Sequence, residues 1–241
     1  MDQFSRTELL IKKEGVDKLK NSHVIVFGIG GVGGYVVEAL ARSGVGHLTL
    51  VDNDDVSMTN INRQIIATLD TVGKAKVEVM KDRILSINKD AVVETKKCFY
   101  LPETAKEFDF TKYDYVADCV DTVSAKISII AEAKKNNIPV ISAMGAGNKM
   151  NPTLLEVSDI SKTSTDPLAR VMRRELRKLG INHLKVIYSK EKPLQLDVEQ
   201  EGVELKEKSG RPAPGSIAFV PSVMGLIMAS EIIKDLIGYE E

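Results

Sequence analysis

The first half of the chain contains residue types that together can bind a nucleoside triphosphate. Residues 28–34 are mostly glycine, which lets backbone N–H groups approach a phosphate closely. Asp52 is a carboxylate that can accept hydrogen bonds from a ribose. Arg63 and Lys76 can neutralise phosphate charge, and Asp121 can hold the magnesium ion that a triphosphate requires. These groups predict a site for a triphosphate bound with Mg²⁺.

The glycine-rich stretch lies between a predicted strand and a predicted helix. His23–Phe27 is an apolar, β-branched run that is typical of a buried parallel strand. Residues 35–43 have apolar side chains at helical spacing, so the glycines open a helix whose positive end faces the ligand. A second apolar strand, residues 48–51, ends at Asp52. This order of elements predicts a nucleotide-binding unit and disfavours a glycine turn that binds nothing.

Strands and helices continue to alternate beyond Asp52. We expect one or two helical turns within residues 6–19, helices over residues 72–88 and 122–136, and strands over residues 92–98, 113–117 and 139–143. This alternation predicts an α/β fold with a Rossmann-like, doubly wound, mostly parallel sheet. In such sheets ligands bind at the carboxyl ends of the strands, and Asp121 follows one of those ends.

The second half of the chain contains a predicted basic helix. An extended segment over residues 153–160 and a polar loop precede it. Asp166 is a suitable N-cap and Pro167 a suitable first helical residue. Between Lys162 and Lys192 there are nine Lys and Arg against three Asp and Glu, a local net charge of +6. A basic helical face is a candidate surface for nucleic acid.

The remaining segments suggest how the chain is organised. We expect a loop over residues 193–215 and a buried helix that begins near Ser222. Residues 1–150 would then form a nucleotide-binding Rossmann-like core with an N-terminal arm. Residues 151–241 would form a C-terminal extension of the same domain, which carries the basic helix, the loop and the terminal helix.

Composition narrows the class of protein. The 241 residues carry a net charge of −1, so nucleic-acid binding would need a local basic patch. Cys98 and Cys119 are too few for a disulfide framework or a four-cysteine zinc site, and they suit a reducing cytoplasm. The first fifteen residues are charged and lack an apolar signal core. We therefore expect a globular cytoplasmic protein, in which Cys119 is a small buried hydrophobe.

Hydride transfer with NAD is the main alternative for a Rossmann-like glycine turn. Arg63 and Lys76 argue against it, because a dinucleotide with two phosphates has less need of such cations. His23, His47 and His183 are not placed for a hydride relay. A tRNA-binding protein without catalysis is a weaker alternative, since it leaves these cations and Asp121 without a role.

Several motifs of the first 150 residues resemble the adenylyltransferases related to ubiquitin-activating enzymes. They are Gly28-Ile29-Gly30-Gly31-Val32-Gly33, Asp52, Asn60-Ile61-Asn62-Arg63-Gln64, Val72-Gly73-Lys74-Ala75-Lys76 and Asp118-Cys119-Val120-Asp121. The reaction shared by this superfamily is attack of a carboxylate on the α-phosphate of ATP, which gives an acyl-adenylate and pyrophosphate.

The resemblance implies a role for each matched residue. The ATP-binding residues would be Gly28, Gly30, Gly31, Gly33 and Asp52, with Asp52 on the ribose. The residues that bind or polarise the phosphates would be Asn60, Arg63, Gln64 and Lys76, although helical spacing alone does not choose between Lys76 and Lys74. Asp121 would ligate Mg²⁺. Arg6 matches an arginine that reaches the partner subunit's nucleotide, which implies a homodimer.

The second half departs from the carrier-protein activators of this superfamily, which usually have paired CxxC motifs and a nucleophilic cysteine. Here both cysteines precede residue 120. Residues 162–170, Pro214-Gly215-Ser216 and the apolar C-terminal helix instead resemble the tRNA-modifying dehydratases. That resemblance implies a cyclising ligase in which ATP adenylates the threonyl carboxylate of threonylcarbamoyladenosine next to the anticodon. An intramolecular nucleophile then closes a ring and expels AMP, so no protein cysteine is needed.

The basic helix and the resemblance together suggest which molecules this protein binds. We expect tRNA to contact the basic helix through Lys162, Arg170, Arg173, Arg174 and Arg177. The alternative is that Lys162, Asp166 and Arg170 contact no substrate and only form a capped helix start. The alternative function is adenylation of the C-terminus of a ubiquitin-like sulfur-carrier protein. A sulfur-transfer protein is a further candidate partner.

Overall fold

The computed structural model describes residues 1–196 and 213–240, and its centre is a seven-stranded sheet. The strands lie in the order β3-β2-β1-β4-β5-β7-β6. They are β1 (His23–Phe27), β2 (His47–Val51), β3 (Val92–Lys96), β4 (Tyr115–Asp118), β5 (Val140–Ala143), β6 (Leu155–Asp159) and β7 (Lys185–Ser189). Neighbouring strands are parallel except β6, which runs antiparallel to β7. The predicted Rossmann-like, mostly parallel sheet is therefore confirmed.

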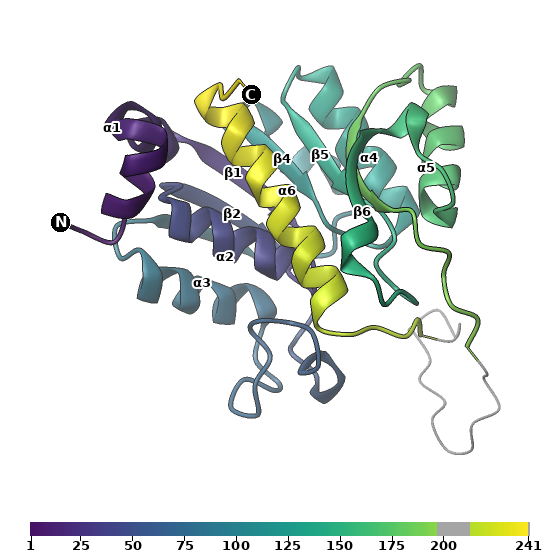
Figure 1. The fold of residues 1–241 in the computed structure, drawn as a ribbon, viewed down its shortest axis with the longest axis horizontal. Helices are drawn as coiled ribbons and strands as arrows, with labels where there is room; N and C mark the ends of the chain where they lie inside the picture. The colour runs from purple at the N-terminus through teal and green to yellow at the C-terminus, as the bar shows by residue number, and fades with distance from the viewer. Residues whose placement is uncertain (197–212, 241) are drawn as a thin grey trace.

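Helices cover both faces of the sheet (Figure 1). They are α1 (Ser5–Asn21), α2 (Gly33–Ser43), α3 (Lys76–Ile87), α4 (Val123–Lys135), α5 (Pro167–Lys178) and α6 (Phe219–Ile237). Most buried apolar residues of α1, α2, α3 and α6 belong to one cluster, and those of α4 and α5 belong to a second. Within the described ranges no helix has the length and apolar character needed to cross a membrane.

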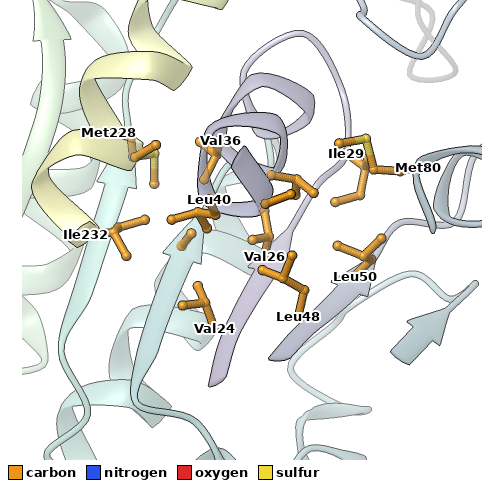
Figure 2. Close-up of a cluster of buried hydrophobic side chains, with 14 of the residues drawn as sticks. Val24, Val26, Ile29, Val36, Leu40, Leu48, Leu50, Met80, Met228 and Ile232 are labelled. Atoms are coloured by element: carbon orange, nitrogen blue, oxygen red, sulfur yellow. The ribbon is translucent and has the colours of Figure 1, made fainter. Parts of the chain in front are cut away.

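Strand β1 shows why the sheet needs a cover on each face. Val24 and Val26 belong to the cluster with α2 and α6, whereas Ile25 and Phe27 belong to the other cluster. Figure 2 shows Val24 and Val26 on the same face as Leu40 of α2. Because each strand residue is buried on one face or the other, the sequence of β1 is a continuous apolar run.

Some elements begin at other residues than predicted. α3 begins at Lys76 because Ala75 before it is extended, with a ψ of 128°, and Gly73 has a left-handed φ of 85°. α6 begins at Phe219, and Pro221 is tolerated because it lies in the first turn, where its missing N–H would have no helical acceptor. α1 is a longer element than predicted, with a kink at Lys12. Most of the predicted loop over residues 193–215 lies outside the described residues.

Strand β7 is an element that the sequence analysis does not predict. It is short, and Val186, Ile187 and Tyr188 are all buried in it between β5 and β6. β6 and β7 extend the sheet formed by the first half of the chain, so the segment after residue 150 adds strands to that same sheet.

A buried ion pair fixes the loops at the carboxyl ends of β4 and β5. Lys126 Nζ of α4 lies 2.9 Å from Asp118 Oδ2, and both side chains are fully buried. The same ammonium donates to the carbonyl oxygens of Val120, at 3.1 Å, and Ala143, at 2.8 Å. Asp118 also accepts a 2.6 Å hydrogen bond from Ser142 Oγ. Asp118 therefore supports the loop, and Asp121 lies outside this network.

The variant Lys126→Met should destabilise the protein strongly. It leaves the Asp118 carboxylate buried without a counter-charge, so we expect the free energy of unfolding in urea to fall by about 3–5 kcal/mol. The control Lys134→Met changes an exposed lysine of the same helix and should change stability by less than about 0.5 kcal/mol. The double variant Asp118→Asn/Lys126→Met should recover part of the loss. Equal stability of the two single variants would contradict this account.

Candidate functional site

A cavity of about 870 Å³ lies at the carboxyl ends of β1, β2 and β4. Eight of the predicted site residues line it: Gly28, Gly30, Asp52, Asn60, Arg63, Gln64, Lys76 and Asp121. A second hollow of about 850 Å³ beside α1 contains none of the predicted residues and is wide open to solvent. The candidate site is therefore the cavity at the strand ends, which is where ligands bind in doubly wound sheets.

Glycine is required at different positions of the turn for different structural reasons. Gly28 has a φ of 86°, and a Cβ there would lie 2.8 Å from the carbonyl oxygen of Cys119. A Cβ on Gly33 would lie 1.8 Å from the carbonyl oxygen of Gly28, so only glycine lets α2 start this close to β1. Gly30 lines the cavity beside Gln64, whereas Gly31 faces Pro221 of α6. Gly31 and Gly33 shape the turn without lining the cavity.

Asp52 and Lys76 form a buried charged group at one wall. Asp52 Oδ2 accepts a 2.7 Å hydrogen bond from the backbone N–H of Ile29, and Asp52 Oδ1 accepts one of 2.8 Å from that of Asp54. Lys76 Nζ lies 3.1 Å from Asp54 Oδ2 and 4.0 Å from Asp52 Oδ1. Lys74 is exposed and does not line the cavity. The geometry thus selects Lys76 as the lysine of the cavity.

Arg63 and Gln64 lie in the loop that follows β2. Arg63 Nη1 donates to the carbonyl oxygen of Thr59 at 2.8 Å and to Asn62 Oδ1 at 2.9 Å. Burial lowers the pKa of Arg63, although a guanidinium stays charged at neutral pH. Asn60 Oδ1 accepts from the backbone N–H of Ser57 at 3.0 Å. Gln64 is 6% exposed, and its Oε1 has no hydrogen-bond partner among the described residues. A buried polar atom of this kind is typical of a site that takes a polar ligand.

Asp121 supplies a carboxylate that fits a magnesium ion held jointly with phosphates. It is exposed at the cavity, and Thr122 Oγ1 donates to it at 3.4 Å. No cluster of three or more acidic, histidine or cysteine side chains that could hold a metal alone occurs in the described ranges. Mg²⁺ is commonly bound by one or two carboxylates together with substrate phosphates and water. One carboxylate beside a phosphate site fits that mode.

The rim of the cavity includes residues that the sequence analysis did not assign to the site. Ala213, Pro214 and Ser216, which precede α6, line it. Asn62 Nδ2 donates to the carbonyl oxygen of Ser216 at 2.9 Å, and Asn148 bonds to Gly215. Asn62 lies inside the matched motif at residues 60–64, which was the signal available for it. The role of Asn148 depends on a tertiary contact that no spacing indicates.

The basic helix α5 lies outside the cavity, and its arginines are not equivalent. Arg173 Nη1 donates to the carbonyl oxygen and Oγ1 of Thr163, at 2.9 and 2.6 Å, so it holds the preceding loop. Arg174 pairs with Glu175 at 2.7 Å. Arg170 and Arg177 are exposed, and neither has an ion-pair partner within the part of the chain that the structure describes. Lys162 and Arg6 are exposed, and neither lines the cavity.

A second buried lysine joins the start of α5 to the carboxyl end of β5. Asp166 Oδ1 accepts the backbone N–H of Ala169 at 2.8 Å, which confirms the predicted N-cap. Asp166 Oδ2 lies 2.6 Å from Lys149 Nζ, and both side chains are buried. The same ammonium donates to the carbonyl oxygen of Gly145. The basic helix therefore begins at the edge of the sheet that contains the cavity.

Both cysteines line the cavity, yet neither is set up as a nucleophile. Burial raises the pKa of the Cys98 thiol and of the Cys119 thiol. Cys119 Sγ packs 3.7 Å from Met228 Sδ of α6. Because the thiolate is the nucleophilic form, a raised pKa disfavours covalent catalysis.

Comparison with known proteins identifies the family. The ThiF family matches residues 4–241. The tRNA threonylcarbamoyladenosine dehydratase of Bacillus subtilis (strain 168) is 50% identical, over 98% of this chain and 95% of that protein. The crystal structure of E. coli tRNA N6-threonylcarbamoyladenosine dehydratase, TcdA, in complex with ATP has a TM-score of 0.87 at 34% identity, and covers 98% of this chain and 94% of its own.

Similarity to a carrier-protein activator is more limited. The sulfur carrier protein ThiS adenylyltransferase of E. coli (strain K12) is 33% identical over 60% of this chain and 58% of that protein. The Bacillus subtilis dehydratase matches at a higher identity and over a larger share of both proteins. The chain therefore belongs to the ThiF family, and over nearly its whole length it is similar to tRNA threonylcarbamoyladenosine dehydratases.

Proposed function

We propose that this chain is an ATP-dependent dehydratase of threonylcarbamoyladenosine in tRNA, acting in the cytoplasm. The observation that carries the proposal is the cavity at the strand ends, which gathers a glycine turn, two cations and a free carboxylate in a chain half identical to a named dehydratase. The substrate would be the modified adenosine next to the anticodon, and ATP would supply the leaving group.

The reaction has two balanced steps. In the first, a threonyl carboxylate oxygen attacks the α-phosphorus of ATP, the bond to the bridging oxygen breaks, and pyrophosphate leaves. In the second, a nucleophile of the same modified nucleoside attacks the acyl carbon, a ring closes, and AMP leaves. The net change in the nucleoside is the loss of one water. The second step is intramolecular, so its high effective concentration makes a protein nucleophile unnecessary.

The residues of the cavity have roles that fit the first step. Arg63 and Lys76 stabilise negative charge on the phosphates as the bond breaks, and Gly28 and Gly30 allow close approach of the backbone. Asp52 binds the ribose, and Asn60 and Gln64 supply polar contacts to the phosphates. Asp121 would hold Mg²⁺, which when bound neutralises phosphate charge.

Activation of a ubiquitin-like carrier remains the alternative adenylation reaction. It would place a flexible protein tail in the same cavity and would produce pyrophosphate exchange without tRNA. A sulfur-transfer protein stays a predicted partner, although burial raises the pKa of the Cys98 and Cys119 thiols and so disfavours either as a nucleophile.

Dehydration should depend on Mg²⁺, ATP and Asp121. Incubation with Mg-ATP and tRNA that carries threonylcarbamoyladenosine should give a nucleoside lighter by one water in mass spectrometry. We expect Asp121→Ala, or removal of Mg²⁺ with EDTA, to lower the rate by about 10²-fold or more. Asp70→Ala removes an exposed carboxylate outside the cavity and should keep wild-type activity. Absence of magnesium-dependent ATP binding by the wild-type protein would rule the function out.

The basic helix should contribute to tRNA affinity through its exposed arginines. If Arg170 and Arg177 each contact one phosphate, the variant Arg170→Ala/Arg177→Ala should reduce the slope of log affinity against log salt by about 1.5 to 2. Lys89→Ala/Lys134→Ala removes two exposed charges elsewhere and should leave the slope unchanged. Arg173→Ala should act instead through stability, since its guanidinium holds Thr163. Equal slopes for the two double variants would exclude α5 as the tRNA surface.

We also propose that the active enzyme is a homodimer in which Arg6 serves the partner's site. Arg6 is exposed on α1 and does not line the cavity of its own chain, so a role in phosphate chemistry requires a second copy. Co-expressed Arg6→Ala and Asp121→Ala chains should regain about a quarter of the active sites by forming mixed dimers. No regain of activity, with a single-chain mass by light scattering, would refute this arrangement.

A further inference from the structure

We infer that Asn148 is a positioning residue for Arg63, which it reaches through the rim of the cavity. Asn148 lies in the turn after β5, whereas Arg63 lies in the loop after β2, and Asn148 does not line the cavity itself. The effect of Asn148 on catalysis rests on the proposed function. The hydrogen bonds of Asn148 are independent of that function.

Asn148 bonds to the chain on both sides of residues 195–214. Its side-chain Oδ1 accepts the backbone N–H of Gly215 at 2.6 Å, and its own backbone N–H donates to the carbonyl oxygen of Gly215 at 2.8 Å. Its carbonyl oxygen accepts the backbone N–H of Leu194 at 2.7 Å. Asn148, a residue of the turn after β5, thus holds the backbone at both Leu194 and Gly215.

A path of one peptide bond and two hydrogen bonds leads from Gly215 to Arg63. Gly215 is followed by Ser216, whose carbonyl oxygen accepts Asn62 Nδ2 at 2.9 Å. Asn62 Oδ1 in turn accepts Arg63 Nη1 at 2.9 Å. Because Asn62 uses both ends of its amide, a shift of the rim moves Asn62 Oδ1, which is one of the two acceptors of Arg63 Nη1; the other is the carbonyl oxygen of Thr59. Two asparagines from different loops thus hold adjacent residues of the rim.

The backbone at Asn148 restricts which residue can do this. Asn148 has a φ of 57°, a left-handed conformation that favours Gly, Asn and Asp. A Cβ on the preceding Gly147 would lie 2.8 Å from Pro214 Cβ, so the turn and the rim are already in close contact. Asp keeps both the conformation and the acceptor oxygen, Gly keeps only the conformation, and Ala keeps neither.

This ranking provides a test with a matched control. Asn148→Gly should weaken ATP binding, measured by calorimetry with ATP alone, by about threefold to tenfold, the worth of one hydrogen bond. Asn148→Asp should retain most of the affinity. Asn137 has the same φ of 57° in the turn before β5, at the other end of the sheet, so Asn137→Gly reports the cost of an added glycine alone and should bind ATP normally.

Two further readouts separate positioning from a general loss of structure. In the Arg63→Ala background Asn148→Gly should have no additional effect on ATP affinity, because no guanidinium remains to be oriented. Hydrogen exchange without ligand should speed up at the Gly215 amide in Asn148→Gly, while the Leu194 amide, which donates to a backbone oxygen, should keep its protection.

The possible failures are distinguishable. If the wild-type protein neither binds ATP nor dehydrates tRNA, the proposed function fails, and the exchange experiment still tests the contact at Gly215. If the wild-type protein is active but Asn148→Gly behaves like Asn137→Gly, the positioning role is wrong. Additive losses from Asn148→Gly and Arg63→Ala would also overturn it, since the two residues would then act independently.

Discussion

The buried ammonium group of Lys126 is the interaction on which the shape of the cavity depends. It holds a carboxylate at the end of β4, a carbonyl in the following loop and a carbonyl at the end of β5. Three polar groups next to the core are thereby tied to one point. Lys149 joins the next loop to the start of α5 in the same manner. Buried charges of this kind specify a single loop arrangement, which a flexible phosphate substrate requires.

Much of the site could be predicted because its residues lie in short local patterns. A glycine turn between β1 and α2, and carboxylates next to strand ends, are placed by the topology once the strands are recognised. Lys76 required the structure, since helical spacing did not separate it from Lys74, and only the extended backbone of Ala75 shows that α3 begins at Lys76. Strand β7 was missed because a run of three buried residues beside charged neighbours gives a weak periodic signal.

Other features could not be predicted because they depend on contacts between distant segments. Arg173 looks like its neighbours in the sequence, yet its guanidinium is turned toward Thr163 and away from solvent. Asn62 and Asn148 are ordinary loop residues until the rim before α6 is placed between them. Charge alone does not show which cationic residues of α5 and its preceding loop are available to a ligand and which are structural. These residues are Lys162, Arg170, Arg173, Arg174, Arg177 and Lys178.

The reversed direction of β6 has a geometric effect on substrate access. Since β6 ends at the amino edge of the sheet, where Asp159 pairs with Lys185, the chain must cross the sheet once more before α5. That crossing returns it to Asp166 beside Gly145, so α5 starts where the parallel strands finish. A long polyanion laid along the helix would thus have one end at the same edge of the sheet as the cavity.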